Sequence, residues 1–308
     1  MKTGSCELAV VGGGITALTA AWQAALDSCQ VLLVAGNDLP GGLVANIGTL
    51  DGFPGSAPVA GMAMAERLQQ DIVAHGGMIE RGVAKGIDAF GGGLVLRTAT
   101  AQWRAGKVIV ATGARLVALD VPGAAALRDK GVLQCAWCNA GLFRGRQVVV
   151  VGAGDSAFQE TLHLAGHDAR VTMVIRGEAV RARRSLVEQA AANEAITFLW
   201  STEVTAIAGT DRVTGVTLRD RGSGETTALD CDAVFPYIGL VPESAWLGDL
   251  AETTPSGAVI TDARLCTRTS GLYAAGAVRH GYGGRLTDAV GEATLAAREA
   301  CAALAGNL

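Results

Sequence analysis

The sequence is short of charged residues, aromatic rings and basic runs. Of its 308 residues, 18% are charged and 5% are aromatic, and the formal net charge is −4. Nucleic acids and anionic membranes attract clustered Lys and Arg, so we expect neither as a partner. The N-terminus has no signal-peptide pattern and no apolar stretch is long enough to span a bilayer. These absences predict a cytoplasmic protein.

Closely spaced cysteines are also rare. Five of the seven cysteines are scattered singly along the chain, which fits a reducing compartment better than a disulfide scaffold. Only Cys135 and Cys138 are close enough to form a unit. Zinc needs four ligands, and no second pair or nearby His completes a set, so no metal site is expected. A structural disulfide or two buried thiols stay open, but this spacing favours a dithiol that cycles between oxidised and reduced forms.

Glycine and small apolar residues are abundant instead. Half of the residues are hydrophobic and 42 are Gly, which is typical of an α/β protein. A strand–helix–strand pattern near the N-terminus returns 140 residues later. Its predicted elements are 7–11, 15–26 and 31–34 in the first copy, and 147–151, 157–165 and 171–175 in the second.

The repeat predicts two Rossmann-like dinucleotide-binding domains of three layers, with the second inserted into the first. The first domain is expected at 1–114 and 243–308, and the second at 115–242. A linker is predicted after the first part, at 120–123, where the sequence is Asp-Val-Pro-Gly.

A glycine-rich loop follows the first strand of each copy. In such a loop the first glycine permits a tight turn and the second lets the backbone approach a pyrophosphate. A small third residue lets the helix pack close to the strand. The predicted nucleotide-binding residues are Gly12, Gly14 and Ala17 in the first loop, and Gly152, Gly154, Asp155, Ser156 and Ala157 in the second.

The order of these motifs resembles that of a known family. Over essentially its whole length, the chain is similar to the low-molecular-weight, bacterial-type thioredoxin reductases. The matching segments are the two loops, the Cys pair, Gly41-Gly42-Leu43, Asp51-Gly52-Phe53-Pro54-Gly55, Ala111-Thr112-Gly113-Ala114 and 271–276. The resemblance implies a homodimer, a rotation of one domain against the other, Cys138 against the flavin and Cys135 as the attacking thiol.

The resemblance also assigns the cofactor positions. FAD is expected on the first domain, at Gly12, Gly14, Ala17, Gly41, Gly42, Thr112, Gly113, Gly276, Ala277, Arg285 and Leu286. NADPH is expected on the second domain, with NADH left open, at the second glycine loop together with Arg176 and Arg181. An Arg beside the ribose is what holds a 2′-phosphate, although a role of these two Arg residues in surface charge stays open.

Departures from the family concern the proton supply. The family usually has an acid after the second cysteine, where this chain has Asn139, whose amide cannot titrate. Asn139 either limits proton transfer or only shapes the turn. His280 is a candidate replacement, with an exposed loop His as the alternative. Trp137 either contacts an apolar substrate surface or packs at its loop. The other three His residues, at 75, 163 and 167, have no evident partner.

Other departures concern the flavin. Ala277 stands where the family has an Asp, and the loss costs roughly 1–2 kcal/mol of FAD binding if nothing replaces the carboxyl. Gly284-Arg285-Leu286 replaces the usual Arg-Gln-Ala. Arg285, or the start of the helix that follows, is expected to stabilise negative charge on the reduced flavin.

The sequence therefore predicts a flavin-dependent disulfide oxidoreductase. Electrons would pass from NAD(P)H through FAD and Cys135–Cys138 to a thioredoxin-like protein or a small-molecule disulfide. Two alternatives stay open. One is a dithiol oxidase that uses oxygen and has a vestigial nucleotide site, and the other is a non-catalytic flavin-based redox sensor.

Overall fold

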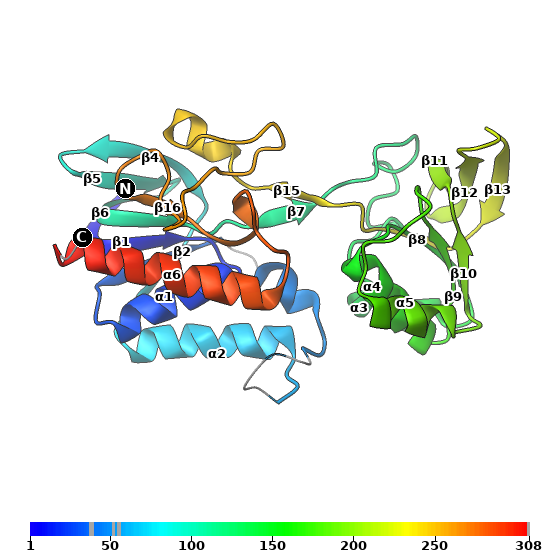
Figure 1. Ribbon diagram of the computed structural model, residues 1–308, viewed down its shortest axis with the longest axis horizontal. Coiled ribbons are helices and arrows are strands. Elements are labelled where there is room, and N and C mark those ends of the chain that lie inside the picture. The colour runs from blue at the N-terminus through cyan, green and yellow to red at the C-terminus, as the bar shows by residue number, and fades with distance from the viewer. Residues whose placement is uncertain (37–39, 51–52, 54–56, 307–308) are drawn as a thin grey trace. The chain divides into compact units, whose positions relative to one another are not determined.

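The computed structural model describes residues 1–36, 40–50, 53 and 57–306, and it divides them into two compact units (Figure 1). Unit 1 is Met1–Arg115 with Val241–Leu308, and unit 2 is Leu116–Leu240. The chain passes between the units in β7 (Ala114–Leu116) and β15 (Leu240–Pro242), which form a two-stranded sheet. Of the family-like segment at 51–55, only Phe53 falls within the described residues. No helix in the described ranges is long and apolar enough to cross a membrane.

Unit 1 is built on a seven-stranded sheet with the order β3-β2-β1-β6-β5-β4, and β16 also pairs with β6. The pairs β3–β2, β2–β1, β1–β6 and β6–β16 are parallel. The pairs β6–β5 and β5–β4 are antiparallel and extend the sheet beyond β6. The strands are β1 (Lys2–Val11), β2 (Val31–Ala35), β3 (Met78–Arg81), β4 (Ala84–Phe90), β5 (Gly93–Thr98), β6 (Ala101–Val110) and β16 (Leu272–Ala274).

Helices α1, α2 and α6 lie together against one face of this sheet (Figure 1). They are α1 (Ile15–Leu26), α2 (Gly61–Ala74) and α6 (Leu286–Leu304), and the short 3-10 helices of the unit are η1 (Gly42–Asn46), η3 (Ala245–Leu250) and η4 (Gly276–Val278). Because side chains alternate along a strand, Leu8 and Val10 pack on the helices. Ala9 and Val11 pack on the opposite side, in a second apolar cluster. The two faces give unit 1 its layers.

The first strand is longer than the sequence predicts, since β1 starts at Lys2 rather than at 7. Its early residues pair with the start of β6, where Gly4 faces Trp103. A Cβ at Gly4 would lie 2.2 Å from the Trp103 ring, so the glycine makes room for the indole. This pairing joins positions about 100 residues apart, and local apolar patterning does not reveal it.

Unit 2 has three layers. Its central sheet is parallel with the order β10-β9-β8-β14, and an antiparallel sheet, β11-β12-β13, packs on one side. Helices α4 and α5 pack on the other side together with α3. The elements are α3 (Ala136–Asn139), η2 (Ala140–Phe143), β8 (Gln147–Val151), α4 (Asp155–Gly166), β9 (Arg170–Val174), α5 (Arg184–Ala191), β10 (Ile196–Leu199), β11 (Thr202–Gly209), β12 (Val213–Asp220), β13 (Thr226–Asp230) and β14 (Ala233–Pro236).

The valine run of β8 shows why this sheet is buried on both faces. Val148 and Val150 belong to the helical side, whereas Val149 and Val151 belong to the side of the antiparallel sheet. A strand in the middle of a parallel sheet therefore has a continuous apolar sequence. The predicted α/β fold with parallel sheets is confirmed.

The predicted linker at 120–123 is wrong, because this segment packs within unit 2. Val121 lies against the apolar cluster beneath the antiparallel sheet. The Ile207 amide donates to the Pro122 carbonyl at 2.9 Å. A Cβ on Gly123 would lie 2.0 Å from the Ile207 carbonyl oxygen, so the turn is pressed onto β11. Asp, Pro and Gly indicate a turn, and the sequence alone does not say that the turn is docked.

Candidate functional site

Cys135 and Cys138 form a disulfide at the start of α3, with Cα atoms 5.4 Å apart. Cys135 is the N-cap residue, and its Sγ accepts the Cys138 backbone N–H at 3.0 Å. Cys135 is half-buried and Cys138 is exposed. An amide that donates to sulfur can also stabilise a thiolate at that sulfur.

Asn139 is the last residue of α3, and its side chain holds the turn. Its Nδ2 donates to the Cys135 carbonyl oxygen at 2.7 Å. An amide in this place fixes the backbone of the Cys pair but cannot exchange a proton at neutral pH. The structure therefore gives Asn139 a shaping contact.

His163 has a partner, which corrects the expectation from the sequence. The Trp137 ring stacks on the His163 ring with centroids 3.9 Å apart, and His167 lies 4.4 Å from His163. Trp137 still exposes 43% of its surface, so one part of the indole packs and another meets solvent. Burial lowers the pKa of His163 to about 4, and His167 adds to the shift. His163 is therefore neutral at pH 7.

Glu160 is a site residue that the sequence analysis missed. Its Oε2 accepts the Trp137 backbone N–H at 3.2 Å, so an acidic side chain of α4 contacts α3, the helix that carries the Cys pair. Burial raises the pKa of Glu160, while hydrogen bonds from the Trp137 and Ala136 amides and from the Tyr237 hydroxyl oppose the shift. Positions 160 and 163 are one turn apart on a helix, so both face α3. That spacing was the available signal.

The second glycine loop places free amides at the start of α4. Gly152 has φ +153°, and a Cβ on it would lie 2.4 Å from the Tyr237 carbonyl oxygen. Gly154 caps α4 without a side-chain hydrogen bond, and a Cβ on it would meet no atom within 4 Å. Ala157 is buried against the sheet, and Ser156 is exposed. This geometry suits a pyrophosphate at a helix N-terminus.

Asp155 is engaged by a neighbour. Its carboxylate accepts the Arg183 backbone N–H at 2.7 Å and pairs with the Arg183 side chain at 2.9 Å. Arg181 is exposed, and its backbone N–H donates to the Ala153 carbonyl at 2.8 Å, which joins this arginine to the loop. Arg176 is exposed just after β9. Together with Arg219 and Arg221, whose effects are larger, it lowers the pKa of Glu203. Of the two predicted arginines, Arg176 therefore follows β9, and Arg181 is joined to the second glycine loop.

In unit 1, the first glycine loop has the same construction. Gly12 has φ +140°, and a Cβ on it would lie 2.2 Å from the Ala111 carbonyl oxygen. Gly14 caps α1 without a side-chain hydrogen bond, and Ala17 is fully buried. Gly41 lies beside this loop, since its N–H donates to the Gly13 carbonyl at 2.8 Å.

Other predicted flavin positions lie near the carboxyl ends of β1 and β6. Gly14 and Gly41 form a bridge, and Gly42 starts η1 directly afterwards. Thr112 follows β6, and its hydroxyl donates to the Glu243 carbonyl at 2.6 Å. Gly113 accepts the Glu243 N–H through its carbonyl at 2.9 Å. These contacts leave the loop after β6 anchored to the returning chain.

Gly276 and Ala277 begin η4, after β16, and they are held by α6. The Glu292 carboxylate accepts the Gly276 N–H at 2.7 Å and pairs with Arg279 at 2.8 Å. Sequence analysis missed both residues of this pair. Their side chains are only 17% and 14% exposed, so the pair is largely shielded from water. Ala277 is half-buried and has no polar side chain to offer a ribityl group.

The remaining predicted residues lie between η4 and α6. His280 is exposed, and its N–H donates to the Val259 carbonyl at 2.8 Å. It belongs to unit 1, whereas Cys135 and Cys138 belong to unit 2, so neither unit by itself brings them together. Arg285 is the exposed N-cap of α6, and its N–H donates to Asp288 at 3.0 Å. Leu286, the first residue of α6, is half-buried.

The cysteines are less isolated than the sequence suggests. Cys29, after α1, and Cys301, on α6, pack on one apolar cluster, and their side chains interact. Both thiols are free, so these two cysteines, far apart in the sequence, are neighbours without a disulfide. Cys6 and Cys231 are buried, and burial raises the pKa of each to about 12. Among the described residues, no cluster of His, Cys, Asp and Glu could hold a metal ion.

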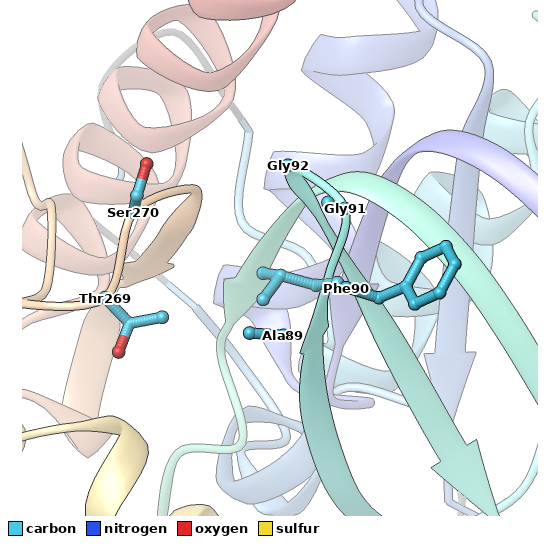
Figure 2. Close-up of a pocket in the computed structure, with 8 residues that line it drawn as sticks. Ala89, Phe90, Gly91, Gly92, Thr269 and Ser270 are labelled. Carbon is cyan, nitrogen blue, oxygen red and sulfur yellow. The ribbon is translucent and has the colours of Figure 1, made fainter.

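Two cavities lie away from most of these residues. In unit 1, a cavity of about 300 Å³ separates the Phe90–Gly92 turn from Thr269 and Ser270 (Figure 2). Its lining contains none of the predicted site residues. In unit 2, a cavity of about 420 Å³ extends from Leu119 to Gln134, the residue before Cys135. Neither of these two cavities is lined by the glycine loops.

Comparisons with known proteins agree with this arrangement. The pattern of the pyridine nucleotide-disulphide oxidoreductases matches residues 6–300. Thioredoxin reductase of Treponema pallidum is 35% identical over 295 residues, which cover 96% of this chain and 95% of the relative. Thioredoxin reductase of Bacillus subtilis is 31% identical over 293 residues, with 95% and 92% covered. The crystal structure of Lactococcus lactis thioredoxin reductase matches with a TM-score of 0.94 at 29% identity, covering 98% of this chain and 99% of that one.

Proposed function

The chain belongs to the pyridine nucleotide-disulphide oxidoreductase family, and from that premise we propose that it is a thioredoxin reductase. It is a flavin-dependent disulfide oxidoreductase that uses FAD and NADPH. We propose a thioredoxin-like protein as the acceptor of its electrons. The observation that most directly supports the proposal is the Cys135–Cys138 disulfide at the N-terminus of α3. The Trp137 N–H between the two cysteines donates to Glu160 of α4, the helix that follows the second glycine loop.

The first glycine loop fits the flavin nucleotide. At Gly12 only a residue without a Cβ can make the turn, and the uncapped amides at Gly14 and beyond offer donors to a pyrophosphate. No acidic side chain lies in the first turn of α1 to repel phosphate. FAD bound here supplies a two-electron carrier between nicotinamide and disulfide. We propose that Gly41, Gly42, Thr112 and Gly113 complete this site.

The family position at Ala277 lacks a carboxylate in this chain, and the nearby acid is committed elsewhere. Both oxygens of Glu292 have partners, Gly276 N–H and Arg279, so Glu292 is not free for the ribityl group. We propose that Glu292 holds the η4 turn in place and that Arg285 and Leu286 lie next to the flavin ring.

The second glycine loop fits the pyridine nucleotide in the same way, through Gly152, Gly154 and Ala157. Asp155 is neutralised by Arg183 at 2.9 Å, which reduces its repulsion of a pyrophosphate. Arg176 and Arg181 are exposed cations beside the loop and fit the 2′-phosphate that distinguishes NADPH from NADH. Ser156 is exposed in the first turn, where a hydroxyl can donate to phosphate.

We also propose a homodimer in the cytoplasm. The family resemblance motivates the dimer, and five cysteines outside disulfides fit a reducing compartment. Sedimentation velocity of the purified flavoprotein tests the first point, since a monomer at all concentrations would contradict it. Fractionation of the native cells tests the second.

An anaerobic titration tests the proposed function. NADPH is added to the purified holoenzyme while the visible flavin spectrum is recorded, and thioredoxin is then added. Bleaching by NADPH followed by recovery with thioredoxin is the expected result. A flavin that ignores NADPH but is bleached by dithiols would favour the dithiol oxidase. Flavin reduction without turnover on any disulfide would favour the redox sensor.

A further inference from the structure

An acidic side chain contacts the start of α3, the helix that carries the Cys pair. Glu160 of α4 accepts the Trp137 N–H at 3.2 Å, and it also interacts with the Ala136 amide. These two amides are the first of α3, immediately after Cys135. The Tyr237 hydroxyl lies in the same place, 3.2 Å from the Ala136 nitrogen. Glu160 therefore shares the N-terminus of α3 with the Cys135 sulfur.

Reduction of the Cys pair takes up protons. Reducing the disulfide breaks the S–S bond with two electrons and needs two protons to give two thiols, whereas a hydride donor delivers two electrons and one proton. When only one thiol is protonated, the other sulfur stays a thiolate. The residue after the pair, Asn139, cannot titrate, and its Nδ2 already donates to the Cys135 carbonyl.

Other groups around Glu160 are neutral or paired elsewhere. Its contacts on α3 are the backbone amides of Ala136 and Trp137, and the disulfide beside them has no charge while oxidised. Burial raises the pKa of Tyr237 and lowers that of His163, so both are neutral at pH 7. The charged side chains of the neighbouring elements pair at the surface, and these pairs are Arg184–Glu188 on α5 and Arg144–Asp168 after η2.

Reduction changes the charge at this helix N-terminus. A thiolate at Cys135 would accept the Cys138 N–H, as the sulfur already does at 3.0 Å. An ionised Glu160 would then face a second negative charge across the same short row of amides. Like charges so placed raise the pKa of the carboxyl further. Burial raises that pKa already in the oxidised state.

We propose that Glu160 takes up a proton when the Cys135–Cys138 disulfide is reduced and releases it when the dithiol is reoxidised. Two electrons enter, the S–S bond breaks, one proton goes to a cysteine sulfur and one to the Glu160 carboxylate. In reoxidation the acceptor disulfide receives the electrons, and the released protons leave with its thiols. Glu160 is a positioning and proton-storing residue, since it contacts the amides of the pair and not its sulfurs. The inference deepens the proposed function and rests on the disulfide cycling.

A redox titration tests the proposal independently of nicotinamide and thioredoxin. The purified holoenzyme is equilibrated anaerobically in oxidised and reduced dithiothreitol, from about pH 5 to about pH 9, and the Cys135 and Cys138 thiols are counted by alkylation and mass spectrometry. In the wild type, one pH interval shows an extra proton taken up on reduction. Within that interval, each pH unit changes the ratio of dithiol to disulfide by up to about tenfold more in the wild type than in Glu160→Gln.

Matched variants distinguish proton storage from structural support. Glu188→Gln removes an exposed carboxyl of the same unit and should leave the wild-type profile unchanged. Tyr237→Phe removes a hydrogen bond that lowers the pKa of Glu160, so the interval should move to higher pH. Superimposable profiles of Glu160→Gln and wild type would overturn the proposal. If Glu160→Gln does not fold, an unshifted interval in Tyr237→Phe would overturn it as well. Bleaching by NADPH remains a separate measurement, so failure of the proposed function is recognised independently.

Discussion

Arg279 and Glu292 form an ion pair at 2.8 Å with both side chains mostly out of water, and Glu292 also holds the Gly276 amide. Removing one partner of a shielded pair leaves the other unpaired, which costs about 3 kcal/mol. We expect Glu292→Ala to lower the free energy of unfolding by about that amount and to loosen FAD. Urea unfolding and the flavin content after gel filtration measure the two effects.

Glu299→Ala is the matched control for that change. Glu299 is on the same helix, but its partner Arg264 is about half exposed, so solvent screens the pair. A clearly smaller loss of stability than for Glu292→Ala is expected. Equal losses in the two variants would contradict the importance of shielding.

Arg181→Ala should separate NADPH from NADH. Loss of a charge-assisted contact to the 2′-phosphate is expected to raise the KM for NADPH about tenfold and leave the KM for NADH unchanged. Steady-state kinetics with both nucleotides measure this. Arg184→Ala, which removes an exposed arginine already paired with Glu188, is the control. A parallel rise of both KM values in Arg181→Ala would show that the side chain does not recognise the phosphate.

We expect His163 to make the free energy of unfolding depend on pH. Its pKa is about 4 in the folded protein against 6.5 for an unperturbed His, so the unfolded chain binds the proton more readily. The free energy of unfolding should therefore fall as the pH drops from 6.5 towards 4, and His163→Gln should lose less over this range. Thermal unfolding across that range tests it, with the exposed His75→Gln as a control that keeps the wild-type dependence.

Cys6 and Cys231 should resist alkylation. With the pKa of each raised to about 12 by burial, about one thiol in 10,000 is ionised at pH 8. In the native, reduced enzyme, iodoacetamide should label Cys135 or Cys138 first, and peptide mass spectrometry identifies the labelled sites. Early labelling of Cys6 or Cys231 would mean that the folded unit opens around them.

Cys135→Ser should stop disulfide turnover and spare the reduction of the flavin by NADPH. The serine keeps the N-cap position but cannot form the disulfide. Visible spectra under anaerobic NADPH measure the first half-reaction, and thioredoxin-coupled insulin reduction measures the second. Persistent turnover in Cys135→Ser would remove the Cys pair from the pathway.

Local patterns in the sequence were enough to predict the central strands and the glycine turns. An apolar run such as 147–151 can be recognised as a strand because a strand inside a parallel sheet is buried on both faces. The start of β1 and the docking of 120–123 were missed or wrong, since the pairing of Lys2–Cys6 with Ala101–Ala105 and the contact of Pro122 with Ile207 join distant segments.

The sequence by itself determined the α/β fold, the nucleotide loops and the Cys135–Cys138 pair, because each depends on residues within a few positions of one another. Tertiary structure alone decided which acid and which rings lie under that pair. Glu160 and His163 are more than 20 residues from Trp137 in sequence, and only the packing of α4 against α3 brings them into contact. Burial then shifts their pKa values, and burial is a property of the folded chain.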